Sequence, residues 1–130
     1  RRPDKYGGSL ENRVRFPLQC MKAIREAAGR DMIVEVLFSG EEPEGGYTMD
    51  EGVEILKMME PYVDVVQFRA GEADPNPPIP YELQHTPFLK YAENAKVKGL
   101  KMKVACVGDA AEKGAGDYNM RSFGELLEIL

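Results

Sequence analysis

Hydrophobic residues recur every three or four positions along two stretches of the chain, which is the spacing of one face of an α-helix. The first stretch covers residues 10–28, between Ser9, which is suited to cap a helix, and Gly29, which is suited to end one. The second follows Thr48 and ends before Pro61. A third helix is expected over about 88–98, and the apolar run SFGELLEIL at 122–130 predicts a fourth.

Three short apolar runs alternate with these helices, at Met32–Phe38, Val63–Gly71 and Lys101–Gly108. Their length and content are typical of parallel strands covered on both faces. This alternation, with no hairpin signal, predicts an α/β fold in which right-handed crossovers join parallel strands. A complete (β/α)8 TIM barrel takes about 250 residues. We therefore expect residues 1–130 to form one unit, a partial TIM barrel of about half the full size, in the order α-βα-βα-βα.

Composition narrows the classes of function. The chain has 130 residues, a net charge of -5, 43% hydrophobic residues and 30% charged residues, which indicates a globular domain rather than a disordered segment. It has no basic cluster suited to nucleic acid and no apolar run of the roughly 20 residues that a membrane span needs. It also lacks the features of a secretory signal peptide, so we expect a cytoplasmic protein that acts on a small molecule.

A dense motif stands at the start of the chain, in RRPDKYGGSLENRVRFPLQCMKAIREAAGRD. Taken alone, Gly7-Gly8-Ser9 could be a tight turn that leads into a helix cap. The whole string, however, resembles the segment after the fourth barrel strand of the Old Yellow Enzyme family of FMN-dependent NAD(P)H:flavin oxidoreductases. The segments FSGEEPEGGYTMDEGVEILKMMEPYVDVVQFRAG and KMKVACVG resemble that family's fifth to seventh strands.

The resemblance implies cofactor-binding positions. Matching Ser39-Gly40 to the family's fifth strand puts Leu37 where the family has an arginine beside the flavin pyrimidine edge, and Arg69 on the next strand is a candidate replacement. Gly108 and Asp109 match a Gly-Gly turn whose backbone amides help bind the FMN phosphate. The family's general acid and its second phosphate-binding segment match positions outside residues 1–130. The resemblance therefore assigns this chain no catalytic residue and no metal.

The function implied is part of an enzyme in which FMN carries hydride from NAD(P)H to an activated, enoate-type alkene. The proline-rich segment 72–87 is expected to form a loop over the substrate, and the isolated chain is expected to be inactive and colourless. Leu37 and Asp109 differ from the residues of the family at the matched positions, so two other functions are also possible hypotheses. One is a diverged barrel that acts as a non-catalytic scaffold in assembly, and the other is a flavin-free barrel that binds a phosphorylated metabolite.

The expected half-barrel leads to a prediction about assembly. It would have two unpaired strand edges and an apolar inner face, and both features drive association. Sedimentation of the isolated chain at micromolar concentration should therefore show a dimer or a larger oligomer. A compact, stable monomer would contradict the prediction.

Overall fold

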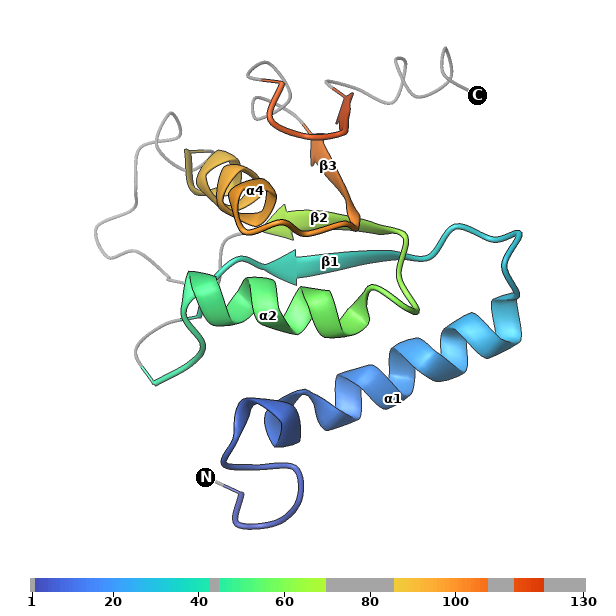
Figure 1. Ribbon diagram of the computed structural model, residues 1–130, viewed down its shortest axis with the longest axis vertical. Coiled ribbons are helices and arrows are strands. Elements are labelled where there is room, and N and C mark those ends of the chain that lie inside the picture. Colours follow the sequence, from blue (N-terminus) through green and yellow to red (C-terminus); the bar gives the residue numbers. More distant parts are fainter. Residues whose placement is uncertain (1, 43–44, 70–85, 108–113, 121–130) are drawn as a thin grey trace.

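The computed structural model describes residues 2–42, 45–69, 86–107 and 114–120 (Figure 1). Its elements are α1 (Leu10–Ala28), β1 (Glu35–Ser39), α2 (Met49–Met59), β2 (Val65–Arg69), α4 (Thr86–Val97), β3 (Lys103–Val107) and β4 (Tyr118–Met120). The strands form one sheet in the order β1-β2-β3-β4, and each neighbouring pair is parallel. Each strand therefore pairs with the next one along the chain, which is the connectivity of a barrel segment.

α1 and α2 begin where the sequence predicts, whereas α4 begins at Thr86 rather than at about residue 88. The Ser9 side chain accepts a hydrogen bond from the Asn12 amide, and α1 ends at Gly29, whose N–H donates to the Arg25 carbonyl. Thr48 and Glu51 form a reciprocal capping box at the start of α2. None of the helices in the described ranges has both the length and the apolar character that crossing a membrane requires.

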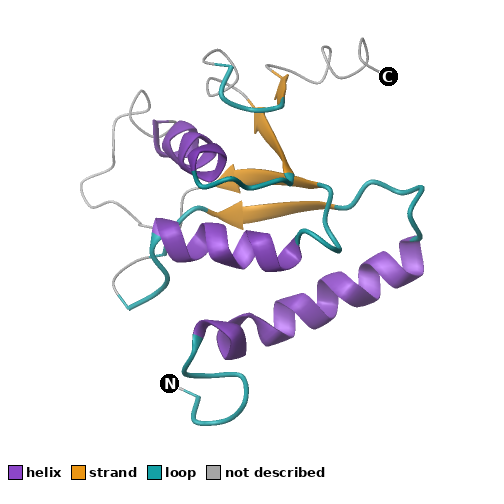
Figure 2. Cartoon of the chain, viewed as in Figure 1, coloured by secondary structure: helices purple, strands orange, loops and turns teal. Residues whose placement is uncertain are grey.

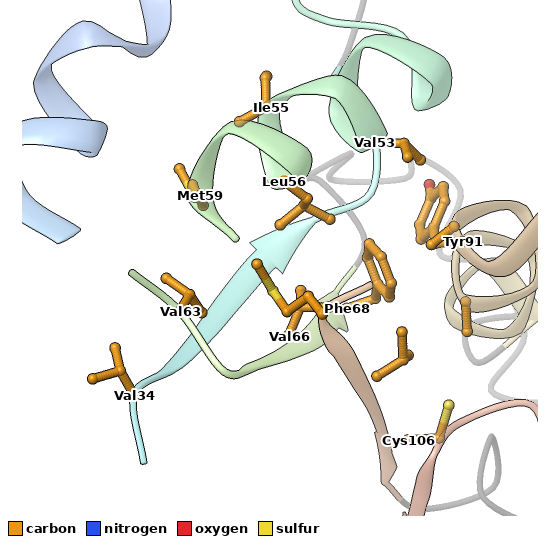
Figure 3. Close-up of a cluster of buried hydrophobic side chains, with 14 of the residues drawn as sticks. Val34, Val53, Ile55, Leu56, Met59, Val63, Val66, Phe68, Tyr91 and Cys106 are labelled. Atoms are coloured by element: carbon orange, nitrogen blue, oxygen red, sulfur yellow. The ribbon is translucent and has the colours of Figure 1, made fainter. Parts of the chain in front are cut away.

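The core lies between one face of the sheet and the helices α2 and α4 (Figures 2 and 3). Alternate strand residues point into it, and Val66, Phe68, Val104 and Cys106 are all at most 7% exposed. Leu56 of α2 and Ala92 of α4 are completely buried against this covered face. α1 packs on α2, farther from the sheet (Figure 1). Both crossover helices thus cover the same face, as in a barrel and unlike a doubly wound sheet.

The other alternate residues of β1 to β3 form what we call the open face. It runs from the amino ends of the strands to their carboxyl ends, and its residues are Glu35, Val65, Lys103, Leu37, Gln67, Ala105, Ser39, Arg69 and Val107. Leu37 is 57% exposed and Val107 is 40% exposed. The helices of the described residues pack on the other face, so the prediction that the strands are covered on both faces is wrong at Leu37 and Val107, whereas Ala105 of the open face is 5% exposed. The predicted fold class, a partial TIM barrel with parallel strands, is confirmed.

Several element boundaries differ from the predicted ones. β1 starts at Glu35 rather than Met32, because the Met32 carbonyl accepts a hydrogen bond from Arg25 instead of entering the sheet. The strand β4 was not predicted at all, so the sheet has a fourth strand beyond the predicted three. The predicted helix at 122–130, the proline-rich loop and the Gly108-Asp109 turn lie wholly or largely outside the described residues.

The polar residues of the N-terminal motif fold the chain before α1. The Asn12 side chain donates to the Gly7 carbonyl, and Arg15 donates to the Lys5 carbonyl and to the Asn12 side chain. Arg13 forms an ion pair with Glu51, the capping residue of α2, at 2.9 Å. Much of this motif therefore has a structural role, since its side chains fix the N-terminal loop and join α1 to α2.

A buried arginine joins α1 to the amino ends of two strands. Arg25 is 5% exposed and donates to the carbonyls of Gly29, Met32 and Tyr62 and to the carboxylate of Asp64. The same Asp64 oxygen accepts from the Val34 amide at 2.8 Å. The Val34 amide and the Arg25 guanidinium hold the pKa of Asp64 below its usual value, although its own burial opposes the shift. One guanidinium thus satisfies acceptors on three segments.

Replacing this arginine should be strongly destabilising. Arg25→Met retains much of the side-chain length but removes the guanidinium donor of three carbonyls and the ion-pair partner of Asp64, which should lower the free energy of unfolding by about 3 kcal/mol. Urea denaturation followed by circular dichroism measures the change. The matched control is Lys22→Met on the same helix, because Lys22 pairs with Glu26 at 3.8 Å on the surface and should contribute at most about 0.5 kcal/mol. Equal effects of the two substitutions would contradict the role of Arg25.

Candidate functional site

The open face forms a small pocket at the carboxyl ends of β1, β2 and β3. Its volume is about 130 Å³, and its lining residues are Leu37, Gln67, Phe68, Arg69, Ala105, Cys106 and Val107. Leu37 is the register partner of Gln67, and Ser39 is the partner of Arg69. In barrels, the carboxyl ends of the strands carry the active site, whereas the amino ends serve stability. The position of the pocket therefore makes it the candidate site.

Two of the four predicted site residues meet in this pocket. Leu37 and Arg69 lie on neighbouring strands and line the same cavity. Gly108 and Asp109, the predicted phosphate turn, lie outside the described residues. Sequence reasoning missed Gln67, which lies between Leu37 and Ala105 in the register. The signal was available, because Gln67 is the one polar residue inside the apolar run VVQF.

The donor set of this pocket fits one edge of a flavin ring. Leu37, Ala105 and Val107 provide an apolar wall of the kind that an aromatic ring system packs against. Gln67 provides an amide that both donates and accepts hydrogen bonds, and Arg69 provides a permanently charged guanidinium. A flavin ring is apolar on its faces and polar along one edge, so it needs apolar side chains next to hydrogen-bonding and charged groups.

The loop after β1 is held against the same end of the sheet. The Gly40 amide donates to the Arg69 carbonyl at 3.0 Å, and the Tyr47 hydroxyl donates to the Ser39 carbonyl at 2.8 Å. A side chain at position 40 would overlap the ring of Tyr91, so this close approach requires glycine. The end of β1 is therefore fixed from β2, from its own loop and from α4.

Glu41 continues this connection to α4. Its carboxylate accepts from the Tyr91 hydroxyl at 2.8 Å and from the Lys90 ammonium at 2.9 Å, and these two bonds lower the pKa of Glu41. Burial, together with the neighbouring Glu41 carboxylate, raises the pKa of Tyr91. Burial and the charge of Glu42 raise the pKa of Tyr47 to about 12. Both phenols therefore stay protonated at neutral pH and serve as hydrogen-bond donors.

Comparison with a family model extends the sequence evidence. Residues 1–121 match the model of the NADH:flavin oxidoreductase / NADH oxidase family. The chain is 49% identical over 73 residues to an NADH oxidase of Thermoanaerobacter brockii, a match that covers 55% of this chain and 11% of that protein. It is 39% identical over 59 residues to a multifunctional alkene reductase/demethylase of Caballeronia cordobensis, covering 45% of this chain and 8% of that protein.

Comparison with solved structures supports the same relationship. The chain superimposes on 2-naphthoyl-CoA reductase, solved in complex with 2-naphthoyl-CoA, with a TM-score of 0.72 and 32% sequence identity. The match covers 92% of this chain and 20% of that chain. Residues 1–130 therefore correspond to a minor part of each of these relatives.

The bond between Tyr91 and Glu41 leads to a prediction about the loop after β1. Tyr91 is 3% exposed and donates to a charged acceptor, so Tyr91→Phe should lower the free energy of unfolding by about 1.5–3 kcal/mol. Lys90→Met is the matched control, because it removes the other partner of the same carboxylate. The side chains of that pair are 51% and 41% exposed, and its loss should cost at most about 1 kcal/mol in urea denaturation. A larger effect from Lys90→Met would overturn the assignment.

Proposed function

Because the chain belongs to the NADH:flavin oxidoreductase / NADH oxidase family, we propose that it is one part of an FMN-dependent enzyme that reduces activated, enoate-type alkenes with NAD(P)H. The observation that carries the proposal is the pocket at the carboxyl ends of the strands, which is lined by apolar side chains together with the amide of Gln67 and the guanidinium of Arg69. The relatives named as an NADH oxidase and an alkene reductase support the reaction class.

The overall reaction balances as a hydride transfer plus a proton transfer. NAD(P)H loses hydride and becomes NAD(P)+, while the alkene gains hydride at its β-carbon and a proton at its α-carbon, so its double bond becomes single. FMN, when bound, supplies the two-electron carrier between the two substrates. This chain contributes binding and orientation to that chemistry, and the groups that polarise the alkene belong to segments outside residues 1–130.

Each residue of the pocket has a part in this proposal. Leu37 and Val107 would exclude water from one side of the ring, and Gln67 would orient its polar edge through the side-chain amide. The bonds of Gly40 and Tyr47 would keep the end of β1 in place beneath it. Gly108 is the residue that we assign to the phosphate, as the family resemblance implies.

The observations constrain the identity of the substrate less than they constrain the reaction class. The family is one of flavin oxidoreductases, and one of the solved structures that superimpose on this chain is a reductase in complex with an aromatic CoA thioester. Free enoates and their CoA thioesters share the conjugated carbonyl that activates the alkene. Free enoates and their CoA thioesters should therefore be compared directly as substrates, since only the thioester needs a site for a large acyl carrier.

The proposal predicts flavin binding by the complete protein that carries this chain. After incubation with FMN and gel filtration, the protein should retain the yellow flavin spectrum and lose it on anaerobic addition of NADH or NADPH. Reoxidation by an enoate or an enoyl-CoA should follow. The isolated chain should stay colourless. Gln67→Leu should weaken FMN binding about two- to tenfold, the effect of one neutral hydrogen bond.

Gln19→Leu is the control for that substitution, because Gln19 lies on the exposed surface of α1. If the complete protein takes up no flavin, the enzyme proposal fails. A phosphorylated metabolite that binds tightly in its place would support a flavin-free barrel. A stable assembly that binds neither ligand would support a scaffold.

A further inference from the structure

A groove of about 380 Å³ lies between α1 and α2, away from the candidate site. Its floor is apolar and consists of the half-buried residues Leu18, Met58 and Tyr62. Its rim includes the charged residues Glu11 and Lys22, which both belong to α1. The groove therefore combines an apolar floor with a charged rim.

This groove opens on the side of α2 that faces away from the sheet. Leu56 is completely buried where α2 packs on the sheet, and Met58 lies about 200° around the helix from it. In a barrel the helices form the outer ring, so this side of α2 belongs to the outer surface. The groove is thus separate from the open face and from the strand edges, and closure of the barrel would leave it accessible.

The residue types of the groove are typical of a protein interface. Tyrosine, methionine and arginine are enriched in the contact surfaces of proteins, and Tyr62, Met58 and Arg15 all line the groove. Arg15 is also fixed in position, because it donates to the Lys5 carbonyl at 2.8 Å and to the Asn12 side chain at 2.7 Å. A side chain that is already ordered loses little entropy when a partner covers it.

The charges along the groove side of α1 are complementary to themselves. Glu11 and Lys22 are both exposed and lie about three helical turns apart. If two copies of α1 lie antiparallel about a twofold axis midway between these residues, Glu11 of each copy faces Lys22 of the other. Lys22 is available for this contact, because its ion pair with Glu26 is long, at 3.8 Å, and exposed.

The same antiparallel arrangement also suits the residues near the axis. Positions 15 and 18 are equally far from the midpoint, so Leu18 of one copy lies opposite the aliphatic part of Arg15 of the other. Arg15 directs its guanidinium toward Asn12 and therefore away from the axis, which keeps the two guanidinium groups apart. Apolar groups thus meet at the centre and opposite charges meet at both ends.

We propose that the groove between α1 and α2 is a dimer interface of the complete protein, and that α1 of a second copy occupies it. Each α1 lies over the groove of the other copy and removes Leu18, Met58 and Tyr62 from water. The two pairs of Glu11 and Lys22 stand at the rim, where charge pairs fix the register of an interface. The inference goes beyond the proposed function and does not depend on flavin binding.

The test reverses charges in the complete protein and measures association by sedimentation equilibrium. The unsubstituted protein should dimerise through this groove. Glu11→Lys alone and Lys22→Glu alone each place like charges opposite one another at both ends of the contact, so each should raise the dissociation constant of the dimer about tenfold or more. An equimolar mixture of the two variants should associate again as a heterodimer, because both of its charge pairs are then of opposite sign.

Lys98→Glu is the matched control, because it makes the same charge change next to α4, on the other side of α2 from α1, and should leave the dissociation constant unchanged (Figure 1). Circular dichroism of each variant checks that the helices are retained. A monomeric complete protein, or association that Lys22→Glu does not weaken, would overturn the inference. It is also wrong if both single variants dissociate and their mixture does not associate again, since a folding defect alone would give that result.

Discussion

The guanidinium of Arg25 is the interaction on which the arrangement of the sheet depends. It sits in the last turn of α1 and satisfies carbonyls of Gly29, Met32 and Tyr62, so it ties together the segments that lead into β1 and β2. Asp64 accepts both this guanidinium and the Val34 amide, and its own carbonyl accepts from the Lys103 amide. The starts of three strands are therefore linked through one aspartate, which is itself paired with one buried cation. A buried charge is tolerated only when it is paired in this way, and its partners are then fixed in position.

Because of this linkage, the amino ends of the strands carry the stabilising contacts and the carboxyl ends carry the candidate site. The amino ends are joined by the bonds of Arg25 and Asp64, which involve no side chain at the carboxyl ends of the strands. At the carboxyl ends, the polar contacts of Gly40, Glu41 and Tyr91 hold a loop beside the pocket without filling it. The residues of the open face are thus outside these stabilising contacts, so their chemistry can serve ligand binding. The same separation of stability from chemistry is general in barrels.

Sequence patterns predicted those parts of the fold that depend on local signals. Ser9, Gly29 and Thr48 mark helix ends through short-range hydrogen bonds, so the bounds of α1 and α2 followed from the residues alone. β4 could not be found in this way, because YNM is too short to show a period, and its segment is placed by Asp117, which exchanges hydrogen bonds with Val104 of β3. Leu37 and Arg69 were predicted as site residues through the family resemblance, and both line the pocket. Gln67 had a local signal as the polar residue inside the run VVQF, whereas the Tyr91–Glu41 bond joins segments about 50 residues apart and no local pattern encodes it.

The covered face and the open face also differ in how freely their residues can change. Phe68, next to Arg69 in β2, packs against Tyr91 with their ring centroids 6.1 Å apart, so its size is constrained by α4. Arg69 points to the opposite side, where no helix packs in the described structure, and a charge there requires no change in the core. Residues of the open face can therefore change without disturbing the packing between the sheet and the helices.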